Sequence, residues 1–272
     1  MTWRTPCSIC SSTCCRLLAI ALATAVAPRV EARTWVVAAT HARADDAGPG
    51  TEERPFRTIA PAALAAQPGD TILVHPGVYR QRVVPARGGE KDKPITYLSA
   101  QPGQAVIKGS DVFTPKWERV EGPEPIFRGV LDPVVFQGEN PFHRGVSING
   151  SDTSKQVRPA QGELEEVLGE VFVESQPYTQ VVRLADMRKQ ERSWLVSADG
   201  KSLLVHFPPA TEPSRCVMEI TTRNRIFAPR RRGLGYIHVK GFTFEHCANQ
   251  GPFPQGGAVS VRSGHDWLIE GN

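Results

Sequence analysis

The sequence predicts an all-β chain: a right-handed parallel β-helix with a short N-terminal capping helix and an inserted antiparallel β-sandwich. Short β-branched runs separated by Pro/Gly turns fill the N-terminal third. A 30-residue repeat follows near the C-terminus, and longer alternating segments lie between these two regions. Coils of short strands with no helical period are typical of a solenoid, and its crossover connections are expected to be right-handed.

The N-terminal part reads as a helix cap followed by the first coils. Ile59 to Ala66 is a helix-length run with a proline near its start, and Pro68-Gly69-Asp70 ends it. Such a helix protects the open end of a solenoid. Four strands are predicted after it: Thr71 to Val74, Val78 to Val84, Ile95 to Leu98 and Ala105 to Ile107.

Residues 1–32 are interpreted as a signal peptide, which predicts a secreted or periplasmic protein. The apolar stretch Leu17 to Ala27 is shorter than the roughly 20 residues that span a bilayer. Val30-Glu31-Ala32 offers a small-residue cleavage site. Ala25-Val26-Ala27 is the competing site, but Pro28 would follow its scissile bond and make a poor substrate.

The formal charge and the cysteine content indicate which partners and which cross-links to expect. Loss of the signal peptide lowers the formal charge from +4 to +2, because three arginines and one glutamate leave with it. This nearly neutral charge argues against a polyanionic partner. The basic run from Arg223 to Arg232 lacks the interleaved aromatic residues of a nucleic-acid-binding module, so we interpret this run as a solvated loop. Only Cys216 and Cys247 remain, and two free thiols are favoured over one disulfide.

The middle of the chain predicts a β-sandwich. Its alternating segments are Val146 to Ile148, Glu170 to Val173, Ser193 to Val196, Leu203 to Phe207 and Val217 to Thr222. Asp199-Gly200 supplies a hairpin turn between two of them. The polar segment Asn149 to Gly162 is expected to be a surface loop.

The solenoid pattern resumes after the insertion. Ile237-His238-Val239-Lys240-Gly241 recurs as Trp267-Leu268-Ile269-Glu270-Gly271, an offset of 30 residues. This register stacks Val239 on Ile269 in the interior and Lys240 on Glu270 outside. Asn272 falls opposite Phe242, so the chain stops inside a strand and is expected to be a fragment. The predicted divisions are 1–32 (signal peptide), 33–111 (cap and first coils), 112–230 (sandwich) and 231–272 (resumed coils).

From about Trp35 onward the chain resembles the β-xylosidases among the glycoside hydrolases whose pectate-lyase-like β-helix carries an inserted β-sandwich. The resemblance rests on these blocks: Gly69 to His75 (GDTILVH), Gly77 to Arg80 (GVYR), Pro94 to Tyr97 (PITY), Ile107 to Ser110 (IKGS), Trp117, Asn140 to Phe142 (NPF), Val239 to Phe242 (VKGF) and Trp267 to Glu270 (WLIE). It implies retaining hydrolysis by two carboxyl groups roughly 5 Å apart. In that family these groups lie on coils further toward the C-terminus, so no catalytic residue is carried over and the 272-residue chain is expected to be inactive by itself.

Two other classes stay open: a polysaccharide lyase, and a non-catalytic carbohydrate-binding or surface protein. The expected partner is a poly- or oligosaccharide, with no nucleic acid, no cofactor, no metal and no membrane once the signal peptide is removed. Self-association into a homo-oligomer is left open.

Six residues are candidates for substrate binding. Glu245, His246, His265 and Asp266 form the acid and histidine cluster of the resumed coils, although polar residues at strand ends usually cap turns. Phe253 lies in the loop Gln250 to Gly257, which could wall a sugar cleft. Asn140 and Phe142 match the family block, although Asn-Pro also starts turns. The six candidates are Asn140, Phe142, His246, Phe253, His265 and Asp266.

We predict that the exported protein begins at Arg33, because cleavage after Ala32 avoids the proline that follows the competing site. Mass spectrometry of the N-terminal peptide of the exported protein checks this. A mature terminus at Pro28 would favour the other cleavage site, and a retained Met1 would contradict the signal peptide.

Overall fold

The computed structural model describes residues 31–136, 140–143, 167–197, 199–248 and 257–272. The fold is the expected all-β parallel β-helix with an inserted sandwich. Residues 1–30, the predicted strand Val146 to Ile148 and the predicted loop Asn149 to Gly162 lie outside the described residues.

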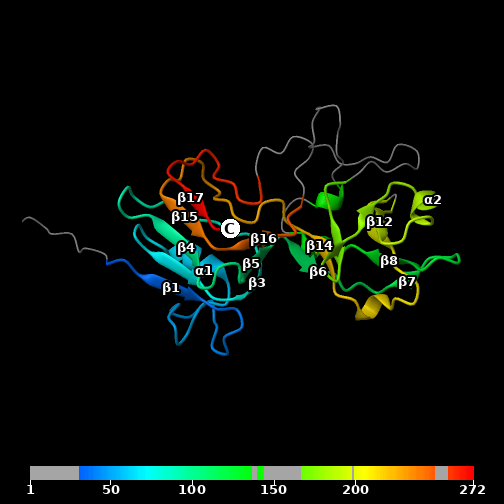
Figure 1. Ribbon diagram of the computed structural model, residues 1–272, viewed down its shortest axis with the longest axis horizontal. Coiled ribbons are helices and arrows are strands. Elements are labelled where there is room, and N and C mark those ends of the chain that lie inside the picture. The colour runs from blue at the N-terminus through cyan, green and yellow to red at the C-terminus, as the bar shows by residue number, and fades with distance from the viewer. Residues whose placement is uncertain (1–30, 137–139, 144–166, 198, 249–256) are drawn as a thin grey trace, which may run out of the picture. The chain divides into compact units, whose positions relative to one another are not determined.

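One parallel sheet forms the longest face of the β-helix, in the order β1-β2-β4-β15-β17 (Figure 1). Its strands are β1 (Thr34–Val37), β2 (Thr71–Val74), β4 (Ile95–Ser99), β15 (Ile237–Lys240) and β17 (Leu268–Glu270). Each strand comes from a different coil, so the sheet runs along the solenoid. β1 adds a coil that the sequence pattern did not predict.

Two further faces close the three coils that begin with β2, β4 and β15. The second sheet has the order β16-β5-β3 and is also parallel, with β3 (Gly77–Arg80), β5 (Ala105–Lys108) and β16 (Thr243–Glu245). The third face consists of single parallel bridges that join Val83 to Phe227 and Phe227 to Val259. The predicted strand Val78 to Val84 is therefore divided between two faces, since β3 ends at Arg80 and Val83 lies on the third face.

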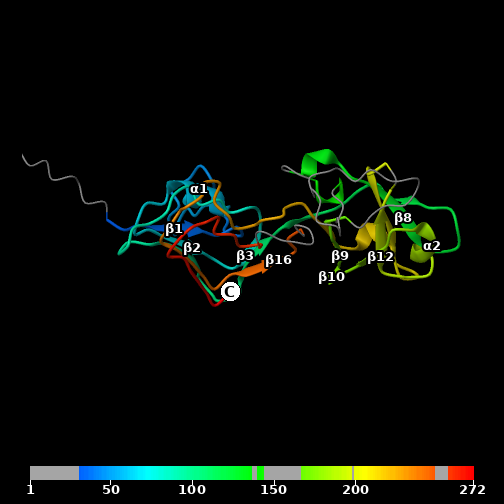
Figure 2. The same ribbon diagram turned by 90° about the horizontal axis from the view of Figure 1, so that it is seen from above.

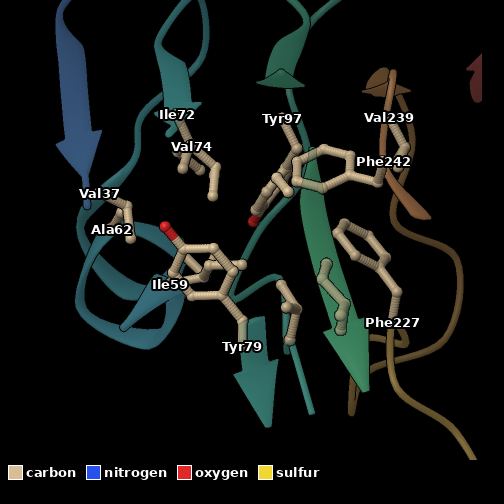
Figure 3. Packing of buried hydrophobic residues seen from close by; sticks show 14 of the residues in the cluster. Val37, Ile59, Ala62, Ile72, Val74, Tyr79, Tyr97, Phe227, Val239 and Phe242 are labelled. Atoms are coloured by element: carbon tan, nitrogen blue, oxygen red, sulfur yellow. The ribbon is translucent and has the colours of Figure 1, made fainter. Parts of the chain in front are cut away.

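Side chains from the three faces fill the interior of the β-helix. Figure 3 shows Ile72, Tyr97 and Val239 from the long sheet directed toward Tyr79 and Phe227 from the other faces. Phe227 is fully buried and makes edge contacts with Tyr97, Phe244 and Trp267, at ring-centroid distances of 4.9, 6.2 and 6.2 Å. Aromatic rings thus join successive coils inside the core.

The short helix α1 (Ile59–Ala65) lies against β1 and β2, as expected for a cap (Figure 2). It buries Ile59, Ala62 and Ala63, and the Arg87 guanidinium donates to the carbonyls of Ala65 and Ala66 at its C-terminal end. Arginine at this end satisfies carbonyls that have no partner within the helix.

Asp70 explains why Pro68-Gly69-Asp70 separates the helix from the first predicted strand. Its buried carboxylate accepts hydrogen bonds from Arg33 N, Trp35 Nε1 and Gln67 N at 2.8, 2.9 and 2.9 Å. One side chain therefore holds the start of β1 against the turn before β2.

The insertion consists of two sheets packed on a second core. One sheet has the order β10-β9-β14-β6, and the other β11-β12-β13-β8-β7. All pairs are antiparallel except β11 with β12. The strands are β6 (Ser110–Val112), β7 (Glu118–Arg119), β8 (Ile126–Val130), β9 (Val171–Val173), β10 (Gln176–Pro177), β11 (Thr179–Gln180), β12 (Ser193–Val196), β13 (Ser202–His206) and β14 (Met218–Thr221). A four-residue helix, α2 (Leu184–Met187), precedes β12.

Turns and short helical segments complete the described chain. The predicted Asp199-Gly200 turn joins β12 to β13, and Gly200 has a φ of 69°. Three 3-10 helices lie in the connections: η1 (Pro133–Val135), η2 (Pro141–His143) and η3 (Pro213–Arg215). No described helix is long and apolar enough to cross a membrane.

The coil that follows the insertion stacks directly on the coil that precedes it. Ile237 pairs with Ile95 between β15 and β4, and Phe244 pairs with Ile107 between β16 and β5. The insertion therefore leaves and re-enters the β-helix between neighbouring coils without interrupting either sheet.

The 30-residue repeat is confirmed in register. Val239 pairs with Ile269, and Lys240 Nζ lies 3.1 Å from Glu270 Oε2. Asn272 Oδ1 accepts a hydrogen bond from Phe242 N, as its predicted position requires. Ile269 is nevertheless 48% exposed, because β17 is an edge strand of its sheet among the described residues.

We predict that Phe227→Ala lowers the free energy of unfolding by about 3–5 kcal/mol, because it removes a buried ring that joins several coils. Urea denaturation followed by circular dichroism measures the change. Val134→Ala is the control, since Val134 is 84% exposed and its truncation should cost less than about 0.5 kcal/mol. Equal effects of the two substitutions would show that the ring does not stabilise the coils.

Candidate functional site

A buried carboxylate, Glu219, gathers polar side chains where the insertion meets the β-helix. The residue lies on β14 and is 4% exposed. Its carboxylate oxygens accept from Arg80 Nη2 at 2.6 Å, Ser110 Oγ at 2.7 Å, His246 Nδ1 at 2.6 Å and Lys108 Nζ at 3.3 Å. We call these five residues the junction cluster.

Strand register brings the junction cluster together. Arg80, Lys108 and Glu245 are paired neighbours at the ends of β3, β5 and β16. They form a ladder of charges across three coils, in which Lys108 Nζ also lies 3.3 Å from Glu245 Oε1. β6 follows β5 almost immediately and pairs with β14, which sets Glu219 against this ladder.

The electrostatics of Glu219 favour the ionised form. Burial alone would raise its pKa, but hydrogen bonds from Arg80, Ser110 and His246 outweigh that penalty and hold the pKa well below its ordinary value. Glu219 therefore has no proton to donate at neutral pH, and its position favours an electrostatic role.

His246 is the one predicted substrate-binding residue that the structure places in this cluster. It follows β16 with a φ of 53°, and its ring stacks on Phe172 at 3.7 Å with an interplanar angle of 8°. The stacked ring and the Glu219 hydrogen bond together restrain it. Glu170 lies nearby and keeps contact with solvent. Partial burial of its carboxyl group raises the pKa, and the charge of His246 opposes this rise.

The other predicted residues lie in different places. His265 and Asp266 form an exposed pair, 2.7 Å between Nδ1 and Oδ2, and the His265 ring meets Tyr236 edge-on. Asn140 Oδ1 accepts from Phe142 N at 2.9 Å, which is the turn-starting geometry. Phe142 is 1% exposed and packs against Trp194 in the sandwich core, so its ring is not presented to a sugar in this structure. Phe253 lies outside the described residues.

The two thiols are free, and neither is activated. Burial raises the pKa of Cys247 to about 11 and also raises that of Cys216. Because the thiolate is the nucleophile, both groups are poor candidates for covalent catalysis at neutral pH.

A cavity of about 670 Å³ lies beside the junction where the chain re-enters the β-helix. Its lining residues are Thr58, Ala60, Gln81, Arg82, Val84, Thr222, Arg223, Asn224, Arg225 and Arg230. The basic run is thus only partly the solvated loop that its sequence suggests: Arg231 and Arg232 are exposed, whereas Arg223 and Arg225 are half-buried at the cavity.

Most members of the junction cluster were missed by sequence reasoning. Arg80 and Lys108 occur within recognisable strands, but Glu219 is 111 residues away from Lys108 and no local pattern connects them. Within the described ranges, no group of three His, Cys, Asp or Glu residues is arranged to hold a metal ion.

Comparison with known proteins identifies relatives of this architecture. The model of a family described as "Protein of unknown function (DUF1565)" matches residues 42–85. The uncharacterized protein YwoF of Bacillus subtilis (strain 168) is 34% identical over 73 residues, which are 27% of this chain and 16% of that protein.

Among solved structures, XylC in its complex with xylose has 28% sequence identity and a TM-score of 0.68. The similarity covers 87% of this chain and 40% of the XylC chain. A second structure, of a glycoside hydrolase, has 14% identity and a TM-score of 0.50 over 80% of this chain and 51% of its own, which shows the fold alone. The chain thus spans less than two thirds of the length of each of these two structures.

We predict that Glu219→Gln lowers the free energy of unfolding by about 3–5 kcal/mol, because it removes the buried counter-ion of Arg80 and leaves Lys108 with Glu245 as its counter-ion. The pH dependence should change as well. The folded-state pKa of Glu219 lies below the unfolded value of about 4.3, so its ionisation stabilises the fold above that value and this stability is lost as the pH falls through the folded pKa.

Denaturation at pH 7 and at several acidic pH values measures both effects, and the variant should lose less stability on acidification than the wild type. Glu270→Gln is the matched control, because its pair with Lys240 is mostly exposed and should contribute at most about 1 kcal/mol. Parallel pH profiles for wild type and Glu219→Gln would contradict the assigned role.

Proposed function

We propose that this chain is the N-terminal part of an exported, carbohydrate-active enzyme of the β-xylosidase type. The observation that carries the proposal is the similarity to XylC, 28% identical over 87% of this chain. A share this large includes both the β-helix and the insertion. XylC was solved in complex with xylose, which favours a neutral pentoside as the substrate of the whole protein.

The proposed chemistry is retaining glycoside hydrolysis, which needs one ionised carboxylate and one protonated carboxyl group roughly 5 Å apart. Glu219 does not serve as the acid, because its pKa is lowered and four side chains occupy its oxygens. The chain spans 40% of XylC, and we place both catalytic carboxylates on coils beyond that portion.

In this proposal the described residues hold the insertion in position. Arg80, Lys108 and His246 come from the β-helix, whereas Glu219 belongs to the insertion. Bonds among them fix β14 relative to β5 and β16, because a buried ion pair with several hydrogen bonds tolerates little displacement. The insertion can then form a wall of a substrate cleft.

Export follows from the predicted signal peptide and is part of the proposal. Cys216 and Cys247 are free thiols. The raised pKa of each keeps the thiolate fraction low, and this slows disulfide formation in an oxidising compartment.

We predict that the full-length gene product releases nitrophenol from 4-nitrophenyl β-D-xyloside, whereas the 272-residue chain does not. The absorbance of nitrophenolate measures both. The matching α-xyloside is the control for anomer specificity. Formation of unsaturated uronates from pectin or alginate, with no xyloside hydrolysis, would instead identify a lyase, and activity of the 272-residue chain would contradict the placement of the carboxylates.

A further inference from the structure

The cavity at the re-entry point has an unusual charge. Among its described lining residues, four are arginines, namely Arg82, Arg223, Arg225 and Arg230, and none is acidic. The chain as a whole is nearly balanced, with 32 basic and 28 acidic residues, so this concentration of positive charge is local. A cationic cavity of this kind favours an anionic ligand.

Two of these arginines carry buried donors without an acceptor. Arg82 Nε and Arg223 Nε have no hydrogen-bond partner in the part of the chain that the structure describes. The Arg223 side chain is 9% exposed, and its terminal nitrogens are already bound to Asp111 at 3.0 and 3.2 Å. An unsatisfied buried donor costs about 1–3 kcal/mol, and a bound acceptor would recover this cost.

The arginines also repel one another. Burial lowers the pKa of Arg82, and the positive charges of Arg225, Arg262 and Arg230 lower it further. Among the described residues, Arg82 Nη2 donates to the carbonyl of Ala228 over a long distance, 3.4 Å. An anion beside Arg82 would favour its charged form and offset this effect of its cationic neighbours.

We propose that this cavity binds the carboxylate of an acidic saccharide, such as a uronic acid residue. The guanidinium group matches a planar carboxylate through paired N–H donors. The volume lies within the range of small-ligand sites and admits a sugar ring, for which the Gln81 amide offers a hydrogen-bonding partner. The saccharide part of the inference rests on the proposed carbohydrate function, whereas the anion part rests on the arginines alone.

The lining residues argue against other ligand classes. None of the described lining residues is aromatic, so these residues offer no platform for stacking a nucleic-acid base or the apolar face of a neutral sugar. Binding must therefore come from charge and hydrogen bonds. A site for a negatively charged sugar would let an enzyme for neutral pentosides recognise acidic groups on the same polymer.

The test is isothermal titration of the full chain with D-glucuronate, D-xylose and inorganic sulfate. We expect glucuronate to bind and xylose to give no heat of binding at this site. Arg82→Gln and Arg230→Gln should each weaken glucuronate binding about tenfold, the effect of losing one charge-assisted contact. Arg230 is exposed, so its substitution keeps the test valid if Arg82→Gln does not fold.

Arg43→Gln is the matched control, since it removes the same charge from an exposed position away from the lining residues. Equal weakening by Arg43→Gln, or no weakening by either cavity variant, would overturn the site. Sulfate binding as tight as glucuronate binding through the same arginines would overturn the saccharide specificity. None of these readouts depends on xyloside hydrolysis. The proposed anion site can therefore be disproved while the proposed hydrolase activity is confirmed, and the activity can be disproved while the site is confirmed.

Discussion

The pairing of β15 with β4 is the constraint on which the other features depend. Ile237 stacks on Ile95, so the chain must leave one coil and return to its neighbour, and strands in adjacent coils lie about 4.8 Å apart. The two ends of the insertion are therefore forced together. Thr222 N and Arg223 N both donate to the carbonyl of Gly109, at 2.8 and 3.0 Å. A Cβ atom at Gly109 would lie 2.8 Å from Cys247 Cα, so only glycine fits this closure without a shift of the backbone.

Because the two ends of the insertion meet, both polar features of the junction form: the cluster around Glu219 and the arginine-lined cavity. Antiparallel pairing of β6 with β14 sets Glu219 against the charge ladder of the second sheet. Asp111 on β6 also forms an ion pair with Arg223, which lies two residues after the end of β14. On the other side of the closure, Arg82 after β3 comes near Arg225 and Arg230. One carboxylate is thus surrounded by donors, while several cations share a cavity whose described lining residues include no acidic one.

The fold could be predicted from sequence further than the site could. Strand runs, Gly/Pro turns and the 30-residue repeat are local patterns, and the register of Val239 on Ile269 and of Lys240 on Glu270 followed from them. Contacts of Glu219 with Arg80 and Lys108 span 139 and 111 residues, and no periodicity relates such positions. For Phe142 a local motif was present but misleading. The motif suggested a contact with a sugar, whereas the side chain is buried in the sandwich core. A motif alone does not show whether an aromatic side chain is buried or exposed.

The enclosed position of the insertion also has a kinetic consequence. During synthesis, β4 is complete long before its partner β15, because the paired residues Ile95 and Ile237 are 142 positions apart. At ribosomal rates the interval is on the order of ten seconds. Throughout that time the edge of β4 is an open template for other strands. Folding of the sandwich brings β15 toward the edge of β4, so any slowing of that step would extend the period in which intermolecular pairing competes with the native coil.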